Sequence, residues 1–331
     1  IGHMVGPVIF DTVKRYLVYS GWHVTWVVNI TDVDDKLIAE SAARGMSMAD
    51  LAREMTTDYL DNLAALSVDG IDEMPKATDH IDGIIAFIQG LVDKGFAYAA
   101  DGDVYFDVTK DDDYGKLTNR TVEQTQGEGG STANRKRSPA DFALWKQAKP
   151  GEPSWESPWG PGRPGWHIEC SAMSGALLGK HFDIHGGGLD LVFPHHENEI
   201  AQSCCAHDGK PFANVWMHNG FINIEGEKMS KSKGNFFTVR DILARGATPA
   251  ALRLELVRTH YRQNANFTLQ GLRDCGRMVD RWCRLRDALS QGTVVAGEGA
   301  GPLESALPAF TEAICDDLNL ARAISVLNEA V

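Results

Sequence analysis

The sequence predicts an α/β protein in which a parallel sheet, split by a small insertion, is followed by a helical region. Three observations lead to this prediction. Residues 23–30 form a β-branched, largely apolar run that is typical of a buried parallel strand. Within residues 182–190 a second strand-like run leads into a turn of three consecutive glycines, and helical periods surround both runs. Beyond about residue 247 the pattern is helical throughout.

The first part of the chain alternates between strand and helix patterns. Apolar residues at helical spacing predict helices at about 10–20, 36–44, 47–66 and 79–95. The clearest stripe lies in the last of these helices and consists of Ile81, Ile84, Ile85, Ile88 and Leu91.

Residues 97–155 differ in texture and are predicted to be the insertion. Val104, Phe106 and Val108 alternate with polar residues, which predicts a strand with one face in water. Residues 122–138 are rich in Gly, Gln, Ser and charge, so we expect a mobile loop there. A helix at about 168–178 follows, and then a strand, the glycine turn and a helix that ends near residue 207.

Composition excludes several classes of protein. No apolar stretch is long enough to cross a bilayer, and residues 1–20 lack the pattern of a secretory signal, so no membrane partner is expected. Six scattered cysteines without a CxxC motif indicate free thiols in a reducing cytoplasm. The net charge of −13 argues against a protein that coats nucleic acid without specificity.

A metal-binding pattern follows Pro194. His195 and Glu199 are four residues apart, so on a helix they lie on one face and can bind a single ion. Cys170 is the natural sulfur donor for a tetrahedral zinc, and His185 is a candidate second-layer group or substrate contact. For the His–Glu pair alone, an acidic first helical turn beside a buried thiol is the alternative interpretation.

Two segments have the composition of a nucleotide site. The glycines at 186–188 allow close approach of a ligand to the backbone, and Asp190 suits a ribose hydroxyl or a substrate amine. Residues 228–235 hold three lysines among Ser and Gly, as in a loop that closes over a polyphosphate. A plain tight turn and a solvated basic loop are the alternatives for each segment alone.

Taken together, these segments resemble the cysteine-specific branch of the class I aminoacyl-tRNA synthetases. Lys228–Ser232 is the full KMSKS signature, and Ile1-Gly2-His3 is similar to the last three letters of the HIGH signature. A cloning scar is the alternative origin of Gly2-His3-Met4. The resemblance covers nearly the whole chain and extends to segments 29–36, 165–173, 182–202 and 216–220.

The resemblance implies the class I synthetase fold, a Rossmann-like doubly wound parallel sheet with a small inserted connective domain, a stem-contact region and a partial helical bundle. The first half of the catalytic domain would cover 1–96 and lack its first strand, and the second half would cover 156–246. Residues 97–155 would be the connective insertion, and 247–331 the stem-contact helices and the start of the bundle. We expect truncation at both ends, with anticodon recognition beyond Val331.

The activity implied by the resemblance is activation of L-cysteine by ATP, with Mg²⁺, and transfer of cysteine to tRNA(Cys) by a monomer. One Zn²⁺ per chain would recognise the thiol, so no editing domain is expected. The zinc ligands would be Cys170, His195 and Glu199, with a fourth ligand, a cysteine, upstream of Ile1. The remaining site residues implied are His3, Gly187, Lys228 and Lys231 for ATP, with His3 and both lysines catalytic, and Trp166, His185 and Asp190 for cysteine.

Arginines recur at helical spacing late in the chain and predict a local basic face for tRNA. Arg273, Arg277, Arg281 and Arg284 share one side of the predicted helix, and Arg253, Arg258 and Arg262 precede them. An ordinary solvated helix face is the alternative.

Three other functions remain open at this point. The first is a ligase of the same ancestry that joins cysteine to an amino-sugar, as in mycothiol synthesis. The second is an inactive relative that binds tRNA or an effector, and the third is a plain zinc hydrolase. Intact phosphate-transfer lysines argue against the second and the third.

Overall fold

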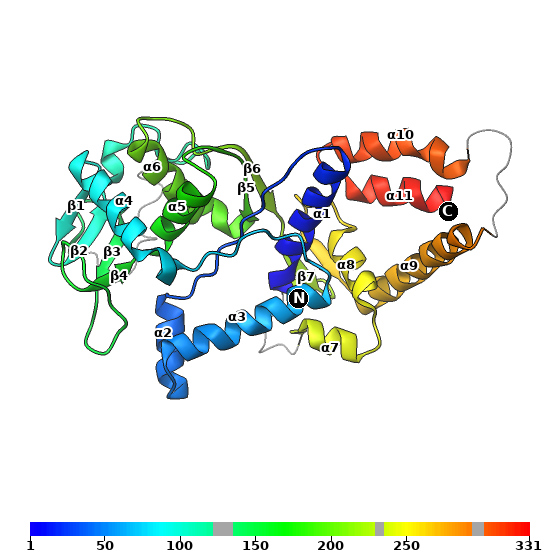
Figure 1. Cartoon of the computed structure of the whole chain (residues 1–331), viewed down its shortest axis with the longest axis horizontal. Helices are drawn as coiled ribbons and strands as arrows, with labels where there is room; N and C mark the ends of the chain where they lie inside the picture. The colour runs from blue at the N-terminus through cyan, green and yellow to red at the C-terminus, as the bar shows by residue number, and fades with distance from the viewer. Residues whose placement is uncertain (122–134, 229–234, 293–300) are drawn as a thin grey trace. The chain divides into compact units, whose positions relative to one another are not determined.

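A computed structural model describes residues 1–121, 135–228, 235–292 and 301–331 (Figure 1). The chain divides into two compact units, and each is described by itself. One unit contains Thr25–Asp58 and Ile71–Met217, and the other contains Ile1–Val24, Tyr59–Gly70 and His218–Val331. The predicted mobile loop at 122–138 falls mainly outside the described residues.

The unit of Thr25–Asp58 and Ile71–Met217 is built on a four-stranded antiparallel sheet with the order β1-β2-β3-β4. Helices α4, α5 and α6 pack against it, and β5 pairs with β6 in a separate two-stranded sheet. The bounds are α2 (Asp35–Arg44), α4 (Ile81–Asp93), β1 (Ala97–Ala100), β2 (Asp103–Phe106), β3 (Phe142–Gln147), β4 (Gly162–Pro164), α5 (Trp166–Leu177), β5 (Phe182–Gly188), α6 (Glu197–Ala206) and β6 (Ala213–Asn219).

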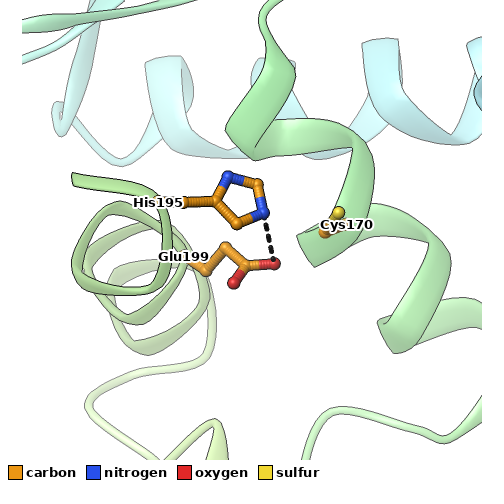
Figure 2. A group of neighbouring side chains, drawn as sticks. All are labelled: Cys170, His195 and Glu199. Carbon is orange, nitrogen blue, oxygen red and sulfur yellow. Dashed lines mark ion pairs between the residues drawn. The ribbon is translucent and has the colours of Figure 1, made fainter. Parts of the chain in front are cut away.

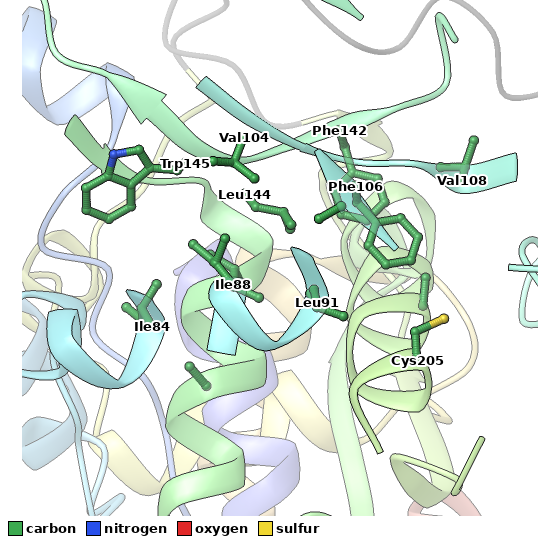
Figure 3. Close-up of a cluster of buried hydrophobic side chains, with 14 of the residues drawn as sticks. Ile84, Ile88, Leu91, Val104, Phe106, Val108, Phe142, Leu144, Trp145 and Cys205 are labelled. Carbon is green, nitrogen blue, oxygen red and sulfur yellow. The ribbon is translucent and has the colours of Figure 1, made fainter. Parts of the chain in front are cut away.

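A single apolar core holds these helices on the sheet. The predicted isoleucine stripe of α4 packs on strand residues such as Phe106 and Leu144, and Cys205 of α6 closes the cluster (Figure 3). Ile84, Ile88 and Leu144 are fully buried. Because the core joins α4, α5 and α6, it fixes the two helices that carry the predicted metal ligands.

The other unit contains a three-stranded sheet with the order β8-β7-β9, in which β7 and β9 run parallel. Helices α10 and α11 lie side by side in Figure 1 and share the buried residues Ala313, Ile314 and Ala323. The bounds are α1 (Val5–Tyr19), β7 (Ile222–Ile224), β8 (Glu227–Lys228), α7 (Val239–Ala244), α8 (Pro249–Val257), β9 (Ala265–Phe267), α9 (Leu269–Ser290), α10 (Pro302–Cys315) and α11 (Leu320–Ala330); α3 (Met48–Ala65) begins in the first unit and ends in this one.

Most predicted helices are present with small shifts of their ends, but three local predictions were wrong. The run at 23–30 is extended yet only half-buried or exposed, because it makes isolated parallel bridges along one edge, at Val27 and Ile30. Strand β9 interrupts the region that was predicted to be helical throughout. It is only three residues long, which is too short for a periodicity to register.

Strand β2 also differs from its prediction, because both of its faces are buried. Asp103 is 5% exposed, and its carboxylate accepts hydrogen bonds from the Tyr105 hydroxyl and the Gln147 amide. Asp107, just beyond the strand, is buried in the same way and accepts from Thr109. A period-two pattern of aspartates therefore marks internal hydrogen bonding here and not a wet face.

Candidate metal centre

Cys170, His195 and Glu199 come together in the first unit. One ligand atom from each lies within 4.8 Å of the other two, and Figure 2 shows the three side chains converging from two helical segments. His195 Nε2 is 3.8 Å from Glu199 Oε1. The Cys170 residue as a whole is half-buried, but its side chain is buried, like the side chains of His195 and Glu199. Sulfur, imidazole and carboxylate are the donor types that zinc takes in proteins.

The carboxylate of Glu199 is the centre of the group. Its Oε1 atom is buried and has no hydrogen-bond partner among the described residues, so it faces the shared point as an unused acceptor. Its Oε2 atom lies 2.9 Å from His185 Nε2 and 3.9 Å from His196 Nε2. His185, His196 and Glu199 thus form a second cluster of possible ligands that shares the same carboxylate.

Electrostatics favour an ionised Glu199. Burial by itself would raise the pKa of this carboxyl, but His185 and His195 together with the His185 hydrogen bond hold the pKa below its usual range. Burial lowers the pKa of His195 by more than Glu199 raises it, so its imidazole is neutral near pH 7. Burial, assisted by the Glu199 charge, raises the pKa of the Cys170 thiol. A bound cation would reverse this last effect, because a coordinating thiol loses its proton.

The ring of His195 is oriented by two neighbours on the segment that begins α5. The Nδ1 atoms of His167 and His195 lie 2.9 Å apart, and Trp166 stacks on the His195 ring with centroids 4.1 Å apart and planes 22° apart. Since Nδ1 of His195 is engaged, Nε2 is the atom left for an ion. Burial, with His195 adding to it, lowers the pKa of His167 to about 3.

Helices α5 and α6 are also joined directly. Gln202 Nε2 donates to the His167 carbonyl at 3.1 Å and to Ser171 Oγ at 2.9 Å. These bonds fix the separation between the helix of Cys170 and the helix of Glu199.

The first turn of α6 is anchored by residues 114–118. Glu197 is 1% exposed, and its carboxylate accepts bonds from the Leu117 amide at 3.2 Å, the Thr118 amide at 2.9 Å and the Thr118 hydroxyl at 2.8 Å. Asn198 Oδ1 accepts from the Tyr114 hydroxyl at 2.6 Å. Residues 114–118 therefore hold in place the turn that lies between His195 and Glu199.

The glycine turn lies beside the metal cluster. A Cβ atom on Gly187 would stand 2.9 Å from His196 Cε1 and 2.8 Å from Leu191 Cδ1, so a side chain there would force one of these two side chains to shift. Asp190 follows in a short 3-10 turn and is exposed. Gly187 as an ATP contact and Asp190 as a cysteine contact stay predictions.

The residues predicted to contact ATP phosphates fall in the other unit. His3 is exposed in the 3-10 turn that leads into α1, at that helix's N-terminal end. Lys228 ends strand β8, and Lys231 lies outside the described residues. Because the two units are described separately, the joint action of these residues with the metal cluster stays a prediction.

The predicted basic face is weaker than the sequence suggested. Arg253 Nη2 lies 2.5 Å from Asp11, Arg262 Nε lies 2.5 Å from Asp317, and Arg258 Nε lies 2.6 Å from Glu255. Two of these partners, Asp11 and Asp317, are distant in sequence. On α9 itself, Arg277 pairs with Asp274 and Arg281 donates to Asn328.

Sequence reasoning missed four residues of the site: His167, His196, Glu197 and Asn198. Three of them are adjacent in sequence to a predicted residue, Glu197 is two positions from both His195 and Glu199, and the runs Trp166-His167 and His195-His196-Glu197-Asn198 were visible. Their roles depend on how α5, α6 and residues 114–118 pack together, which a local sequence pattern does not show.

The family description "tRNA synthetases class I (C) catalytic domain" matches residues 1–276. The chain belongs to this family. It is therefore a ligase-type enzyme with an α/β class I synthetase fold, as predicted.

Curated relatives match this class I synthetase domain over 99–100% of its length and are themselves longer. It is 48% identical to a cysteine–tRNA ligase of Geobacter sulfurreducens, over 100% of this chain and 70% of the relative. It is 49% identical to those of Syntrophotalea carbinolica, over 100% and 69%, and Vibrio parahaemolyticus, over 99% and 70%.

Among solved structures, the domain is similar to Mycobacterium tuberculosis methionyl-tRNA synthetase in complex with methionyl-adenylate. The TM-score is 0.75 at 16% identity, over 99% of this chain and 78% of that one. At this identity the likeness shows the fold alone. Within the described residues, no helix is long and apolar enough to cross a membrane.

Proposed function

We propose that this synthetase domain activates L-cysteine with ATP and transfers it to the 3′ end of tRNA(Cys). The relatives at 48–49% identity are cysteine–tRNA ligases, which supports the substrate assignment. The observation that carries the proposal is the convergence of Cys170, His195 and Glu199 around the unused Oε1 atom of Glu199. This donor set fits Zn²⁺, with a fourth position for another ligand.

Thiol recognition accounts for cysteine specificity. When bound, zinc supplies coordination to a soft thiolate, which separates cysteine from the nearly isosteric serine far better than hydrogen bonds alone. The protein's own residues hold the ligand set in place, because His167 fixes the His195 ring and His185 bonds Glu199. Trp166 and Asp190, both exposed, would contact the cysteine backbone, with His185 beside them.

Adenylate formation is assigned to the other unit's signature residues. His3 lies at an exposed helix N-terminus, where backbone amides favour phosphate. Lys228 and Lys231 would offset the charge that develops on the α-phosphate and on departing pyrophosphate, with Mg²⁺ as counter-ion. Gly187 would allow the nucleotide to approach the backbone. We propose the domain division predicted above, a monomer, and the cytoplasm as the compartment.

Metal content and cysteine-dependent ATP–pyrophosphate exchange test this function in the full-length protein. We expect one zinc per chain, exchange with cysteine but not serine, and loss of both zinc and exchange in Cys170→Ser. Cys283→Ser, at a half-buried thiol on α9, is the matched control and should keep both.

Product analysis separates the remaining alternatives. Cysteine found on tRNA supports the proposal, and cysteine found on glucosaminyl-inositol would replace it with the amino-sugar ligase. Zinc-free parent protein with full exchange activity would contradict the role of the cluster.

A further inference from the structure

A polar cavity of about 530 Å³ lies entirely within the unit that contains His218–Val331. Its walls are β9 with the preceding loop on one side, and α11 with part of α9 on the other. The polar lining residues that matter here are Arg258, Asn264, Asn266, Ser325 and Asn328. None of its lining residues belongs to the metal centre.

The cavity presents amide donors of fixed orientation. Asn264 Oδ1 accepts the Phe221 amide at 2.9 Å, and Asn266 Oδ1 accepts the Gly226 amide at 2.7 Å. Because each oxygen must face an N–H group, each Nδ2 points elsewhere, and neither has a partner among the residues the structure describes. The two side chains stand two residues apart at the start of β9 and are both exposed, so they offer N–H groups from the same face.

The charged group on the cavity wall is a guanidinium whose paired carboxylate does not line the cavity. Arg258 is its one charged lining residue, and no Asp or Glu lines it among the described residues. Glu255 is 3% exposed and forms an ion pair with Arg258. Its carboxylate oxygens lie 2.6 Å from Arg258 Nε and 3.3 Å from Arg258 Nη2. A guanidinium has five N–H donors, so Nη1 remains for a ligand.

The cavity adjoins the arginine row of α9. Asn328, a lining residue, accepts Arg281 Nη2 at 3.1 Å and Trp282 Nε1 at 3.0 Å through its Oδ1 atom. Its Nδ2 atom points to Met278 Sδ at 3.1 Å. The exposed guanidinium of Arg281 therefore extends the donor-rich surface beyond the cavity.

We propose that this cavity binds a backbone phosphate of a bound RNA strand. Phosphate oxygens are acceptors only, and amide and guanidinium N–H groups are the donors that bind them in protein–nucleic-acid complexes. An RNA strand also explains why the donors continue onto α9, since successive phosphates need successive contacts. The choice of RNA over a free anion rests on the tRNA ligase function proposed above.

The test replaces the two amide donors with carboxylates and keeps the hydrogen bonds that the side-chain oxygens accept. In the double variant Asn264→Asp, Asn266→Asp, each new carboxylate keeps an oxygen for the Phe221 or Gly226 amide but replaces the N–H donors with a negative charge. We expect tRNA affinity to fall roughly tenfold or more and the slope of log K against log salt to lose about one unit. Cysteine-dependent pyrophosphate exchange, which needs no tRNA, should be unchanged.

Two further variants keep the test decisive. Asn119→Asp makes the same chemical change at an exposed turn residue with φ of 53°, a conformation that Asn and Asp both tolerate, and should bind tRNA as the parent does. Ser325→Glu places a carboxylate in the cavity from an exposed position of α11 and should weaken tRNA binding even if the double variant fails to fold.

Inorganic phosphate distinguishes a free anion from RNA. If phosphate raises the Tm of the parent but not of Ser325→Glu, while both bind tRNA equally, the cavity is a small-anion site and the proposal is overturned. Equal tRNA affinity and salt slope in the parent and all cavity variants would also overturn it. A parent that lacks cysteine-dependent exchange but loses tRNA on Ser325→Glu would refute the proposed activity and leave the RNA contact standing.

Discussion

The Nδ1 atoms of His167 and His195 lie 2.9 Å apart in the buried layer between α5 and α6. Burial keeps both imidazoles neutral near pH 7, so one Nδ1–H group donates a hydrogen bond to the bare Nδ1 atom of the other ring. The bond leaves His195 Nε2 directed at the point that it shares with Glu199 Oε1 and the Cys170 sulfur. His167 is thus a positioning residue for the proposed metal ligand.

Replacing His167 with Phe should weaken zinc binding by about 10- to 100-fold, because the His195 ring loses the partner that fixes its orientation. Competition with a chromogenic chelator measures the affinity directly. His167→Asn, which restores a hydrogen-bonding group, should recover part of it. His181→Phe is the control, since His181 is exposed and its ring contacts only a backbone carbonyl in the described structure. Unchanged zinc affinity in His167→Phe would rule out the positioning role.

Glu197→Gln should lower the urea midpoint without removing a metal ligand. The parent carboxylate accepts three bonds from Leu117 and Thr118, and an amide NH₂ group in its place would face N–H donors. An unsatisfied buried pair of this kind costs about 1–3 kcal/mol. The exposed Glu156→Gln should leave the midpoint within error. A Glu197→Gln midpoint equal to the parent's would mean that the bonds from Leu117 and Thr118 do not stabilise α6.

Substitution of Arg253 tests whether its charge stabilises the fold or binds tRNA. Its guanidinium lies against Asp11, which is 1% exposed, and also donates to the Leu66 carbonyl at 2.7 Å. Among the residues that the structure describes, Arg253→Met leaves that buried carboxylate paired with Arg15, so we expect a loss of about 3 kcal/mol in the free energy of unfolding.

The matched change for Arg253 is Arg240→Met, in an exposed pair with Asp61 at 3.8 Å, which should cost less than about 1 kcal/mol. Neither change should alter the salt slope of tRNA binding. A reduced slope in Arg253→Met would restore its predicted place in the basic face.

A comparison of the metal cluster with Arg253 shows which contacts a local sequence pattern can predict. The spacing of His195 and Glu199 is a property of one helix, so the metal group could be predicted before any tertiary contact was known. Arg253 and Asp11 are 242 residues apart, and the nearest acid in the sequence, Glu255, pairs with Arg258 instead. His167 is an intermediate case. Cys170, three residues further on the same helix, could be predicted as a ligand, but the contact of His167 with His195 depends on the packing of α5 against α6.

The same reasoning explains the strand errors. Asp103 and Asp107 have the spacing of a solvated face, yet their carboxylates are satisfied inside the protein by bonds from Tyr105, Gln147 and Thr109. Hydropathy treats a buried, fully bonded aspartate as a surface residue. The isoleucine stripe of α4 was predicted correctly because apolar burial needs no partner of a specific type.

Glu169 gives the last prediction, a pH dependence of stability. It is fully buried, and neither carboxylate oxygen has a partner among the described residues. Burial, with the charges of Asp32 and Asp34 adding to it, raises its pKa well above the ordinary value of 4.5. Above that ordinary value the unfolded chain releases the proton while the native protein keeps it. The free energy of unfolding therefore falls as pH rises towards the raised pKa.

Glu169→Gln removes this titration, so its urea midpoint should decline less than the parent's between roughly pH 5 and pH 8. All samples carry the same zinc concentration, so that the contribution of the neighbouring Cys170 is shared between parent and variant. Glu156→Gln, at an exposed carboxyl, should follow the parent at every pH. If the midpoints of the parent and Glu169→Gln run parallel across this range, Glu169 is not a buried protonated acid. Its oxygens would then have to be ionised and paired with a group bound from solution, because a buried bare carboxylate costs several kcal/mol.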